Sequence, residues 1–207
     1  MINHLKKIIK KTPLFYFFKL YWRVQDYFRK KNEKINPGAS SGLCKYKIVK
    51  KYAEKYNLDT LIETGTFLGE MVNASKNNFN TIYSIESNKR LYGLAKKRFK
   101  KNKNVKILYG DSSNKLNKVI KKQKTPALFW LDAHYSGGIT TKKEKETPIR
   151  EELAQIFNNF KTGNIILIDD ARLFVGKRDY PRIEEIKKMI LSRNMKIKIE
   201  EDVIIIY

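Results

Sequence analysis

The chain has 207 residues, a length that fits one α/β domain, or one domain with an appendage, and that is enough to bury a hydrophobic core. A single cysteine, Cys44, excludes an intramolecular disulfide, a thiolate metal cluster and a pair of redox thiols, and indicates a reducing compartment. Lysines and arginines total 44 against 21 acidic residues, which gives a net charge of +23. This excess favours polyanionic partners but does not identify a reaction.

The sequence predicts no membrane-spanning helix, because no run of 18 or more apolar residues occurs. Lysines at positions 6, 7, 10 and 11 interrupt any apolar stretch at the start, and no small-residue cleavage site follows, so we expect no cleaved signal. The expected localisation is cytoplasmic, with peripheral attachment to the inner face of the membrane as a further hypothesis.

Three regions differ in composition. Residues 1–36 form a basic aromatic arm, with ten lysines and arginines against Asp26 and Glu33, a net charge of +8. Turn-forming residues then mark 37–43 as a linker, and residues 44–207 are the expected catalytic domain. We interpret the arm as a contact with an anionic membrane surface. The alternative is that it packs on the chain's own domain or on a second subunit in a homodimer.

Beyond the linker, helical and strand patterns alternate, which is typical of a parallel sheet with helices on both faces. In chain order we expect a helix at about 44–56, a strand at 60–63, a helix at 69–78, a strand at 81–85, a helix at 88–101, a strand at 105–109, a helix at 112–122, a strand at 127–132, a helix opened by 147–148, a strand at 165–168, a helix from 181 to about 192, and strands at 196–200 and 203–207. The last two strands predict a tight antiparallel hairpin.

The turn after the first predicted strand carries two glycines. It reads Glu63-Thr64-Gly65-Thr66-Phe67-Leu68-Gly69. Gly65 and Gly69 suit a tight turn where the backbone approaches a ligand closely, although such a turn can also be a plain connection. Phe67 stands where a dinucleotide-binding turn has glycine, and this bulky ring leaves little space for a pyrophosphate. The turn therefore favours a cofactor without phosphates.

Acidic residues follow the other predicted strands. Glu86 ends the second strand, where the diol of a ribose would lie, and Gly110-Asp111-Ser112 follows the third. Asp132 ends the fourth strand, and Asp169 and Asp170 end the fifth. If those two strands are neighbours, the three carboxylates converge and repel one another unless a cation neutralises them, and oxygen ligands suit Mg²⁺. The alternative is that Asp132 and Asp170 cap the next segments or pair with Arg172.

His134 lies two residues past Asp132, at the same expected edge of the sheet. An imidazole there can accept a hydroxyl proton near neutral pH, which favours a general base, although an isolated histidine is usually structural. The long polar loop that follows carries paired glycines over residues 135–141. It is either a lid over an acceptor or an ordinary surface loop.

The motifs together resemble those of class I S-adenosylmethionine-dependent methyltransferases, in the catechol O-methyltransferase-like branch. The resemblance implies a Rossmann-like, seven-stranded, mostly parallel sheet with a C-terminal antiparallel hairpin strand. It also implies S-adenosylmethionine as the cofactor. The implied cofactor-binding residues are Glu63, Thr64, Gly65, Thr66, Gly69, Glu86, Asp111, Ser112 and Asp132. Of these, Glu86 would bind the ribose hydroxyls, and Asp111 and Ser112 would contact the adenine.

Leu131-Asp132-Ala133-His134-Tyr135 and Ile168-Asp169-Asp170 are also similar to segments of bacterial sugar O-methyltransferases. One departure is Tyr135, where the catechol enzymes have a lysine base. We expect a methyltransferase that acts on a hydroxyl of a sugar or glycan, assisted by a divalent cation. The expected catalytic residues are Asp132, His134 and Asp170, and the expected metal ligands are Asp132, Asp169 and Asp170.

Three alternatives stay open. The charge fits an RNA ribose 2′-hydroxyl methyltransferase, but nucleic acid is the less favoured partner. The fourth strand ends in Asp132-Ala133-His134, without the Asn/Asp-Pro-Pro-Tyr motif of enzymes that methylate base amino groups. A methyltransferase for another small molecule is the second alternative, and a binding module without enzyme activity is the third.

Overall fold

The computed structural model describes residues 42–133, 147–191 and 193–207. The basic aromatic arm, His134 and the loop at 135–141 lie outside the described residues. So does the linker up to residue 41. In the described part of the chain, no helix is both long enough and apolar enough to cross a membrane.

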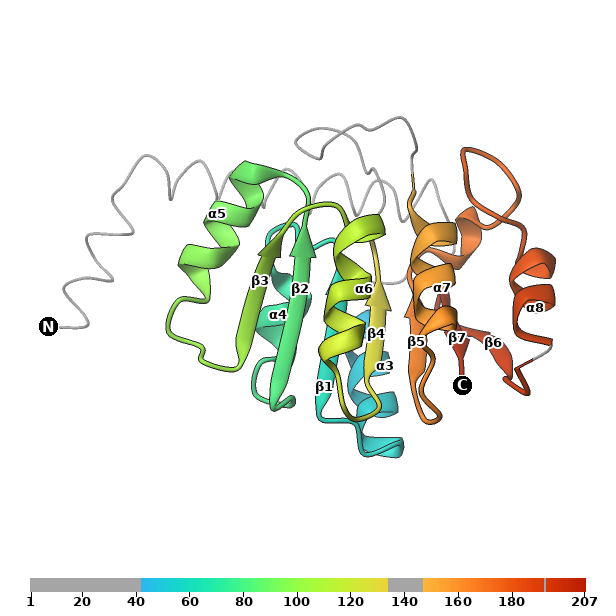
Figure 1. The fold of residues 1–207 in the computed structure, drawn as a ribbon, viewed down its shortest axis with the longest axis horizontal. Coiled ribbons are helices and arrows are strands. Elements are labelled where there is room, and N and C mark those ends of the chain that lie inside the picture. The colour runs from blue at the N-terminus through green and yellow to red at the C-terminus, as the bar shows by residue number, and fades with distance from the viewer. Residues whose placement is uncertain (1–41, 134–146, 192) are drawn as a thin grey trace, which may run out of the picture. The chain divides into compact units, whose positions relative to one another are not determined.

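A seven-stranded sheet forms the centre of this domain (Figure 1). Its strands are β1 (Thr60–Thr64), β2 (Thr81–Glu86), β3 (Val105–Tyr109), β4 (Leu128–Leu131), β5 (Ile165–Ile168), β6 (Ile197–Glu200) and β7 (Val203–Ile206). The strand order is β3-β2-β1-β4-β5-β7-β6. Strands β1 to β5 pair in parallel, and β7 is antiparallel to both β5 and β6. The predicted mostly parallel sheet with a C-terminal hairpin is confirmed.

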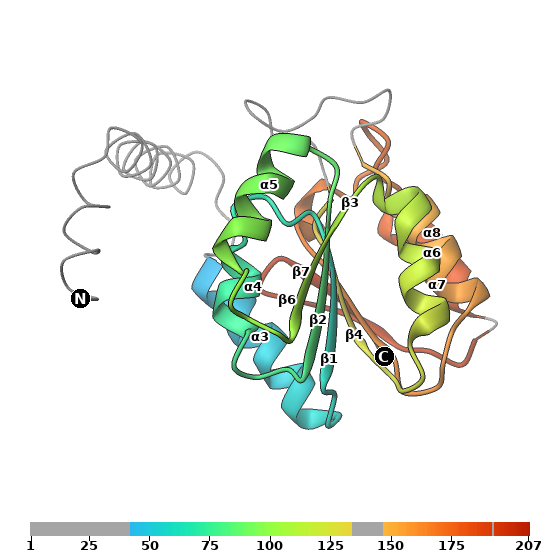
Figure 2. The same ribbon diagram turned by 60° about the vertical axis from the view of Figure 1, so that its left-hand side comes forward.

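Helices cover both faces of the sheet. Figures 1 and 2 show α3, α4 and α5 on one face and α6, α7 and α8 on the other. Their bounds are α3 (Gly42–Lys55), α4 (Glu70–Ser75), α5 (Lys89–Arg98), α6 (Ser112–Lys122), α7 (Ile149–Asn158) and α8 (Ile183–Leu191). A 3₁₀ turn, η1 (Ala171–Leu173), follows β5. This two-sided cover is the arrangement that the alternating sequence pattern predicted.

The central strands are apolar at consecutive positions because both of their faces are covered. All four residues of β4 and all four of β5 are buried. Leu128 and Trp130 belong to the hydrophobic cluster on the α3 side, whereas Phe129 and Leu131 belong to the cluster on the opposite side. Side chains on both faces of these strands are therefore packed in a hydrophobic cluster. This packing holds the strands in place, and with them the residues that follow each strand.

Several element boundaries differ from the expectation by a few residues, and those of α3 and α4 lie nearest the site edge. Helix α3 begins at Gly42, two residues earlier than expected, so the last part of the expected linker is helical. Helix α4 covers Glu70–Ser75, and it begins at Glu70 because Gly69 has φ 74° and cannot belong to a right-handed helix. The hairpin turn holds Glu201 and Asp202, whose φ values of 48° and 63° match the two-residue turn that suits twisted antiparallel strands.

Candidate active site

The predicted site residues lie at the carboxyl ends of the parallel strands. Thr64 of β1 is in register with Leu131 of β4, and Leu131 with Ile168 of β5. The residues that follow these strands are therefore neighbours. The Asp132 amide donates to the Thr64 carbonyl at 3.0 Å, and the Asp169 amide donates to the Leu131 carbonyl at 3.1 Å. In such a sheet, ligands bind at this edge.

The glycines of the turn after β1 are required by close packing. Gly65 has φ 85°, and a Cβ there would lie 2.4 Å from the carbonyl oxygen of Asp132. A Cβ on Gly69 would lie 2.5 Å from the Phe99 ring. Any larger residue at these positions would push the turn away from the loop after β4 or from α5. The turn therefore lies directly against the segment that carries Asp132.

Glu86 joins the end of β2 to this turn. Its Oε2 accepts a hydrogen bond from the Phe67 amide at 2.8 Å, and its Oε1 accepts one from the Asn88 amide at 2.7 Å. Its backbone carbonyl accepts from the Gly110 amide at 2.9 Å. The Phe67 and Asn88 amides fix the orientation of the Glu86 carboxylate. Three separate sequence motifs thus meet at Glu86.

Glu63 lies beneath the turn with 2 % of its surface exposed. The Ser84 hydroxyl donates to its carboxylate, and the Ser84 and Thr66 hydroxyls bond to each other. Burial raises the pKa of Glu63 well above its usual range, the Ser84 hydrogen bond opposes that rise, and the nearby carboxylates of Asp132 and Glu86 add to it. Glu63 and Thr66 are therefore an internal support of the turn.

The remaining residues expected to bind the cofactor lie at the ends of β1 and β3. The Thr64 hydroxyl is buried and has no hydrogen-bond partner among the described residues. Asp111 caps the N-terminus of α6, where its Oδ1 accepts from the amide of Ser113 at 2.9 Å and from the hydroxyl of the same residue at 2.8 Å. Ser112 is buried in the first turn of α6. An orphaned buried hydroxyl at this edge fits a bound polar group.

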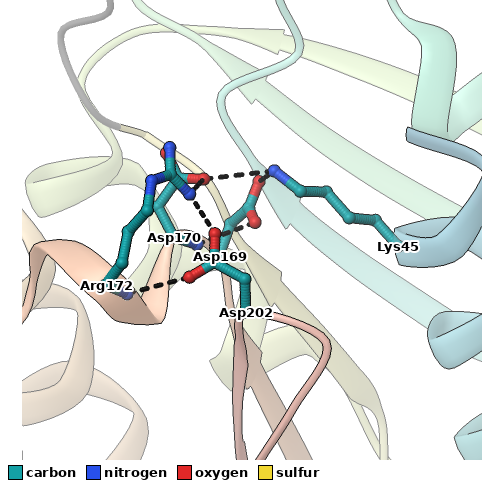
Figure 3. A network of polar contacts seen from close by, with 5 residues as sticks. All are labelled: Lys45, Asp169, Asp170, Arg172 and Asp202. Atoms are coloured by element: carbon teal, nitrogen blue, oxygen red, sulfur yellow. Dashed lines mark hydrogen bonds and ion pairs between the residues drawn. The ribbon is translucent and has the colours of Figure 1, made fainter. Parts of the chain in front are cut away.

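The acids after β5 are paired with a lysine that was not among the predicted site residues. Lys45 Nζ lies 2.6 Å from Asp169 Oδ2 and 3.1 Å from Asp170 Oδ1 (Figure 3). Arg172 Nη1 lies 2.8 Å from Asp170 Oδ1 and also bonds to Asp202. The predicted pairing of these acids with Arg172 is thus observed for Asp170. Asp132 also acts electrostatically on both Lys45 and Asp169, so it is close to this cluster.

The charges in this group shift one another's pKa. Burial lowers the pKa of Lys45, but Asp169, Asp170 and Asp132 outweigh that effect and raise it overall. Lys45 is therefore a cation at neutral pH. Burial raises the pKa of Asp169, as do the neighbouring carboxylates of Asp132 and Asp170, while Lys45 acts in the opposite direction. A carboxylate with this environment depends on the lysine for its ionised form.

The expected magnesium ligands do not fit a divalent cation in this arrangement. Asp169 Oδ2 is bound by Lys45, and Asp169 Oδ1 accepts from the Asp170 amide at 2.7 Å. Asp170 Oδ1 accepts from both Lys45 and Arg172. Over residues 42–133, 147–191 and 193–207, no group of three or more acidic, histidine or cysteine side chains is arranged to hold a metal ion. The Lys45 ammonium group occupies the place between Asp169 and Asp170 where a metal ion was expected.

Topology alone places the first turns of α3, which include Lys45, at the site edge. Helix α3 leads through a short turn into β1, so the start of the helix lies at the same edge of the sheet as the end of the strand. Lysine is abundant throughout the chain, however, and nothing local distinguishes Lys45 from its neighbours. Its position near the start of the helix, and not a sequence motif, is what indicates that Lys45 belongs to the site.

No family model matches the sequence, and no curated protein matches it either. Solved structures do match. The O-methyltransferase TomG from Streptomyces achromogenes, solved with SAM, is 15% identical, with coverage of 84% of this chain and 83% of that one and a TM-score of 0.59. The Podospora anserina methyltransferase PaMTH1, solved with SAH, is 15% identical over 91% and 94% of the two chains, with a TM-score of 0.57.

The O-methyltransferase from Bacillus cereus, solved with SAH, is 11% identical, with coverage of 88% of each chain and a TM-score of 0.58. These similarities show that the chain has the class I S-adenosylmethionine-dependent methyltransferase fold. The expectation of that fold is confirmed.

Proposed function

We propose that this chain is an S-adenosylmethionine-dependent O-methyltransferase that acts on a hydroxyl group of a sugar or glycan. One observation carries the proposal: the Glu86 carboxylate is held by the Phe67 amide of the glycine turn, at 2.8 Å, at the carboxyl edge of a sheet with the methyltransferase strand order. A fixed carboxylate beside a tight turn is suited to hold a ribose diol next to the cofactor's amino-acid end.

The other residues have supporting roles in this proposal. Asp111 and Ser112, at the start of α6, contact the adenine ring. The backbone from Thr64 to Thr66 faces the amino-acid part of the cofactor. The Thr64 hydroxyl, which has no hydrogen-bond partner in the described part of the chain, gives that region a hydrogen-bonding group. Gly65 keeps the turn close enough to β4 for Asp132 to reach the same space. These assignments are supported by the position of the residues at the carboxyl edge of the parallel strands.

S-adenosylmethionine, when bound, supplies a methyl group on a sulfonium sulfur. An acceptor hydroxyl bound beside it would take this methyl group from the sulfonium sulfur and would give its proton to a base of the protein. We assign that base to the end of β4, as Asp132 or as His134 two residues further on. Alignment of oxygen, carbon and sulfur supplies most of the rate, so the chain's main task is to position the acceptor.

A panel of acceptors tests this function. The full-length chain is incubated with S-adenosylmethionine labelled in its methyl group, together with sugar nucleotides, an oligosaccharide, a catechol and a short RNA. We expect label on a sugar hydroxyl, detected by mass spectrometry as a gain of one methyl group. Label on the RNA ribose would replace the glycan proposal with the RNA alternative. Label on no acceptor, together with no cofactor binding, would favour a binding module.

A further inference from the structure

Lys45 lies in the first part of α3, on the side that faces the sheet. It precedes Ile48 and Val49 by three and four residues, and both of those side chains are buried. Residues at these spacings lie on the same side of a helix, so the packing of α3 directs the lysine towards the site edge. Its side chain is 18 % exposed, against 3 % for Asp169 and 8 % for Asp170. The ion pair is therefore largely removed from water.

The charges of the cluster require such a cation. Asp169 and Asp170 are both buried, and a buried carboxylate is costly unless it is paired and hydrogen-bonded. Arg172 reaches Asp170 but also bonds to Asp202, so it serves two carboxylates. Asp169 is paired instead with Lys45, whose Nζ lies 2.6 Å from its Oδ2. Lys45 also bridges to Asp170, which makes it the group that joins the two acids (Figure 3).

We infer that the Lys45 ammonium is the resident cation of the acceptor end of the site, and that it does there the charge-neutralising and positioning work of a divalent metal. This inference rests on the proposed function. An ammonium has three N–H donors, and two of them bond to Asp169 and Asp170 in the described contacts. The third can donate to an acceptor oxygen. Lys45 is thus a positioning residue, and methyl transfer proceeds without added metal.

Manganese binding tests the inference without any assay of activity. Mn²⁺ is titrated into the wild-type chain, Lys45→Met and Lys50→Ala, and the bound ion is measured by electron paramagnetic resonance. Lys50→Ala is the matched control, because Lys50 lies in the same helix and pairs with the exposed Glu54. We expect no Mn²⁺ at the cluster in wild type or in the control. Lys45→Met should bind Mn²⁺ at the cluster with a Kd at least about tenfold below the highest Mn²⁺ concentration at which wild type shows none, because removal of the ammonium leaves the carboxylates uncompensated.

Activity provides the second measurement. Wild-type turnover should be unchanged in a chelator, and Lys45→Met should lower kcat by about 100-fold through loss of alignment, while the Kd for S-adenosylmethionine stays the same. Mg²⁺ should restore part of the activity of Lys45→Met, and Lys45→Arg should retain more activity than Lys45→Met.

Wild-type binding of Mn²⁺ that Asp169→Asn abolishes would overturn the inference, as would wild-type activity that a chelator removes and Mg²⁺ restores. Failure of the proposed function is distinguishable, because it would appear as a wild-type chain that binds no S-adenosylmethionine. In that case the Mn²⁺ titration of the wild-type chain would still decide whether Lys45 is the cation of the cluster.

Discussion

Glu63 shows how burial at the site edge changes the behaviour of one residue. Its carboxyl group is buried beneath the turn, and burial raises its pKa above the value in the unfolded chain. The folded state therefore binds a proton more tightly than the unfolded state does. The stability that comes from this protonated acid is present below the unfolded pKa and is lost as the pH rises towards the folded pKa.

Glu63→Gln tests this assignment, because the amide retains a hydrogen-bond acceptor for Ser84 but cannot ionise. We expect the free energy of unfolding of the variant, relative to wild type, to increase with pH above the unfolded pKa, with a slope of up to about 1.4 kcal/mol per pH unit. Urea unfolding at a series of pH values measures this difference. The exposed Glu54→Gln is the control, and a difference for Glu63→Gln that does not vary with pH would refute the assignment.

Gly65 and Gly93 form a matched pair of glycines. Gly65→Ala places a Cβ 2.4 Å from the Asp132 carbonyl oxygen at φ 85°, whereas a Cβ on Gly93 meets nothing within 4 Å. Gly65→Ala should lower the free energy of unfolding by about 1 to 3 kcal/mol, because the residue is held in a strained conformation and must displace backbone. Gly93→Ala lies inside α5 and should raise it by about 0.5 to 1 kcal/mol. Equal effects in urea unfolding would contradict the packing argument.

At the residue scale, the sequence predicted individual acids better than their partners. Glu86, Asp132, Asp169 and Asp170 follow apolar strands, so their arrival at one edge could be derived from the strand pattern. The pairing with Lys45 spans 124 residues to Asp169, and it depends on how α3 packs against the sheet. No local spacing carries that information. The cation of the cluster was therefore expected to be a metal ion, whereas the structure has an ammonium there.

At the scale of elements, strands were more predictable than helix ends. The continuous apolar residues of β4 and β5 identify strands covered on both faces, and the two closely spaced final strands identify the hairpin. The expected helix at 69–78 overran α4 at both ends. At the N-terminal end, Gly69 is in a left-handed conformation, and a Cβ there would lie 2.5 Å from the ring of Phe99, a residue 30 positions away. Tertiary packing decided that boundary.

Asp111 caps the N-terminus of α6 and is also a proposed contact of the adenine ring. Asp111→Ala should lower the free energy of unfolding by about 1 kcal/mol through loss of the cap, and it should also weaken S-adenosylmethionine binding. Asp111→Asn keeps an acceptor for the Ser113 amide and should restore most of the stability. Urea unfolding and calorimetric titration of both variants separate the two roles. Equal stability of Asp111→Ala and wild type would contradict the role of Asp111 as the cap.

At the scale of the whole molecule, the net charge of +23 is the dominant feature. We propose that the basic aromatic arm at 1–36 binds an anionic membrane surface and brings the enzyme to a lipid-linked acceptor. Each cation near such a surface contributes about 1 kcal/mol, and salt weakens the attraction. A second copy of the chain, or packing of the arm on its own domain, is the alternative that a binding experiment must exclude.

Vesicle flotation provides that experiment. The full-length chain should float with anionic vesicles, float weakly with neutral ones and lose its binding in high salt. A chain that begins at Ser40 should stay folded, as judged by circular dichroism, and should no longer float. Full-length protein that ignores anionic vesicles would refute the membrane role, and a truncated chain that unfolds would make the arm structural.

The central claim is that Glu86 holds S-adenosylmethionine at the carboxyl edge of the sheet, and calorimetric titration of the cofactor tests it most directly. Wild type and the surface control Glu54→Ala should bind with the same Kd. Glu86→Ala should lose about 1 to 3 kcal/mol of binding free energy, about a 5- to 150-fold rise in Kd, because the cofactor's hydroxyl groups lose their acceptor and the Phe67 amide loses its partner. An unchanged Kd in Glu86→Ala, or a wild-type chain that binds no S-adenosylmethionine, would contradict the claim.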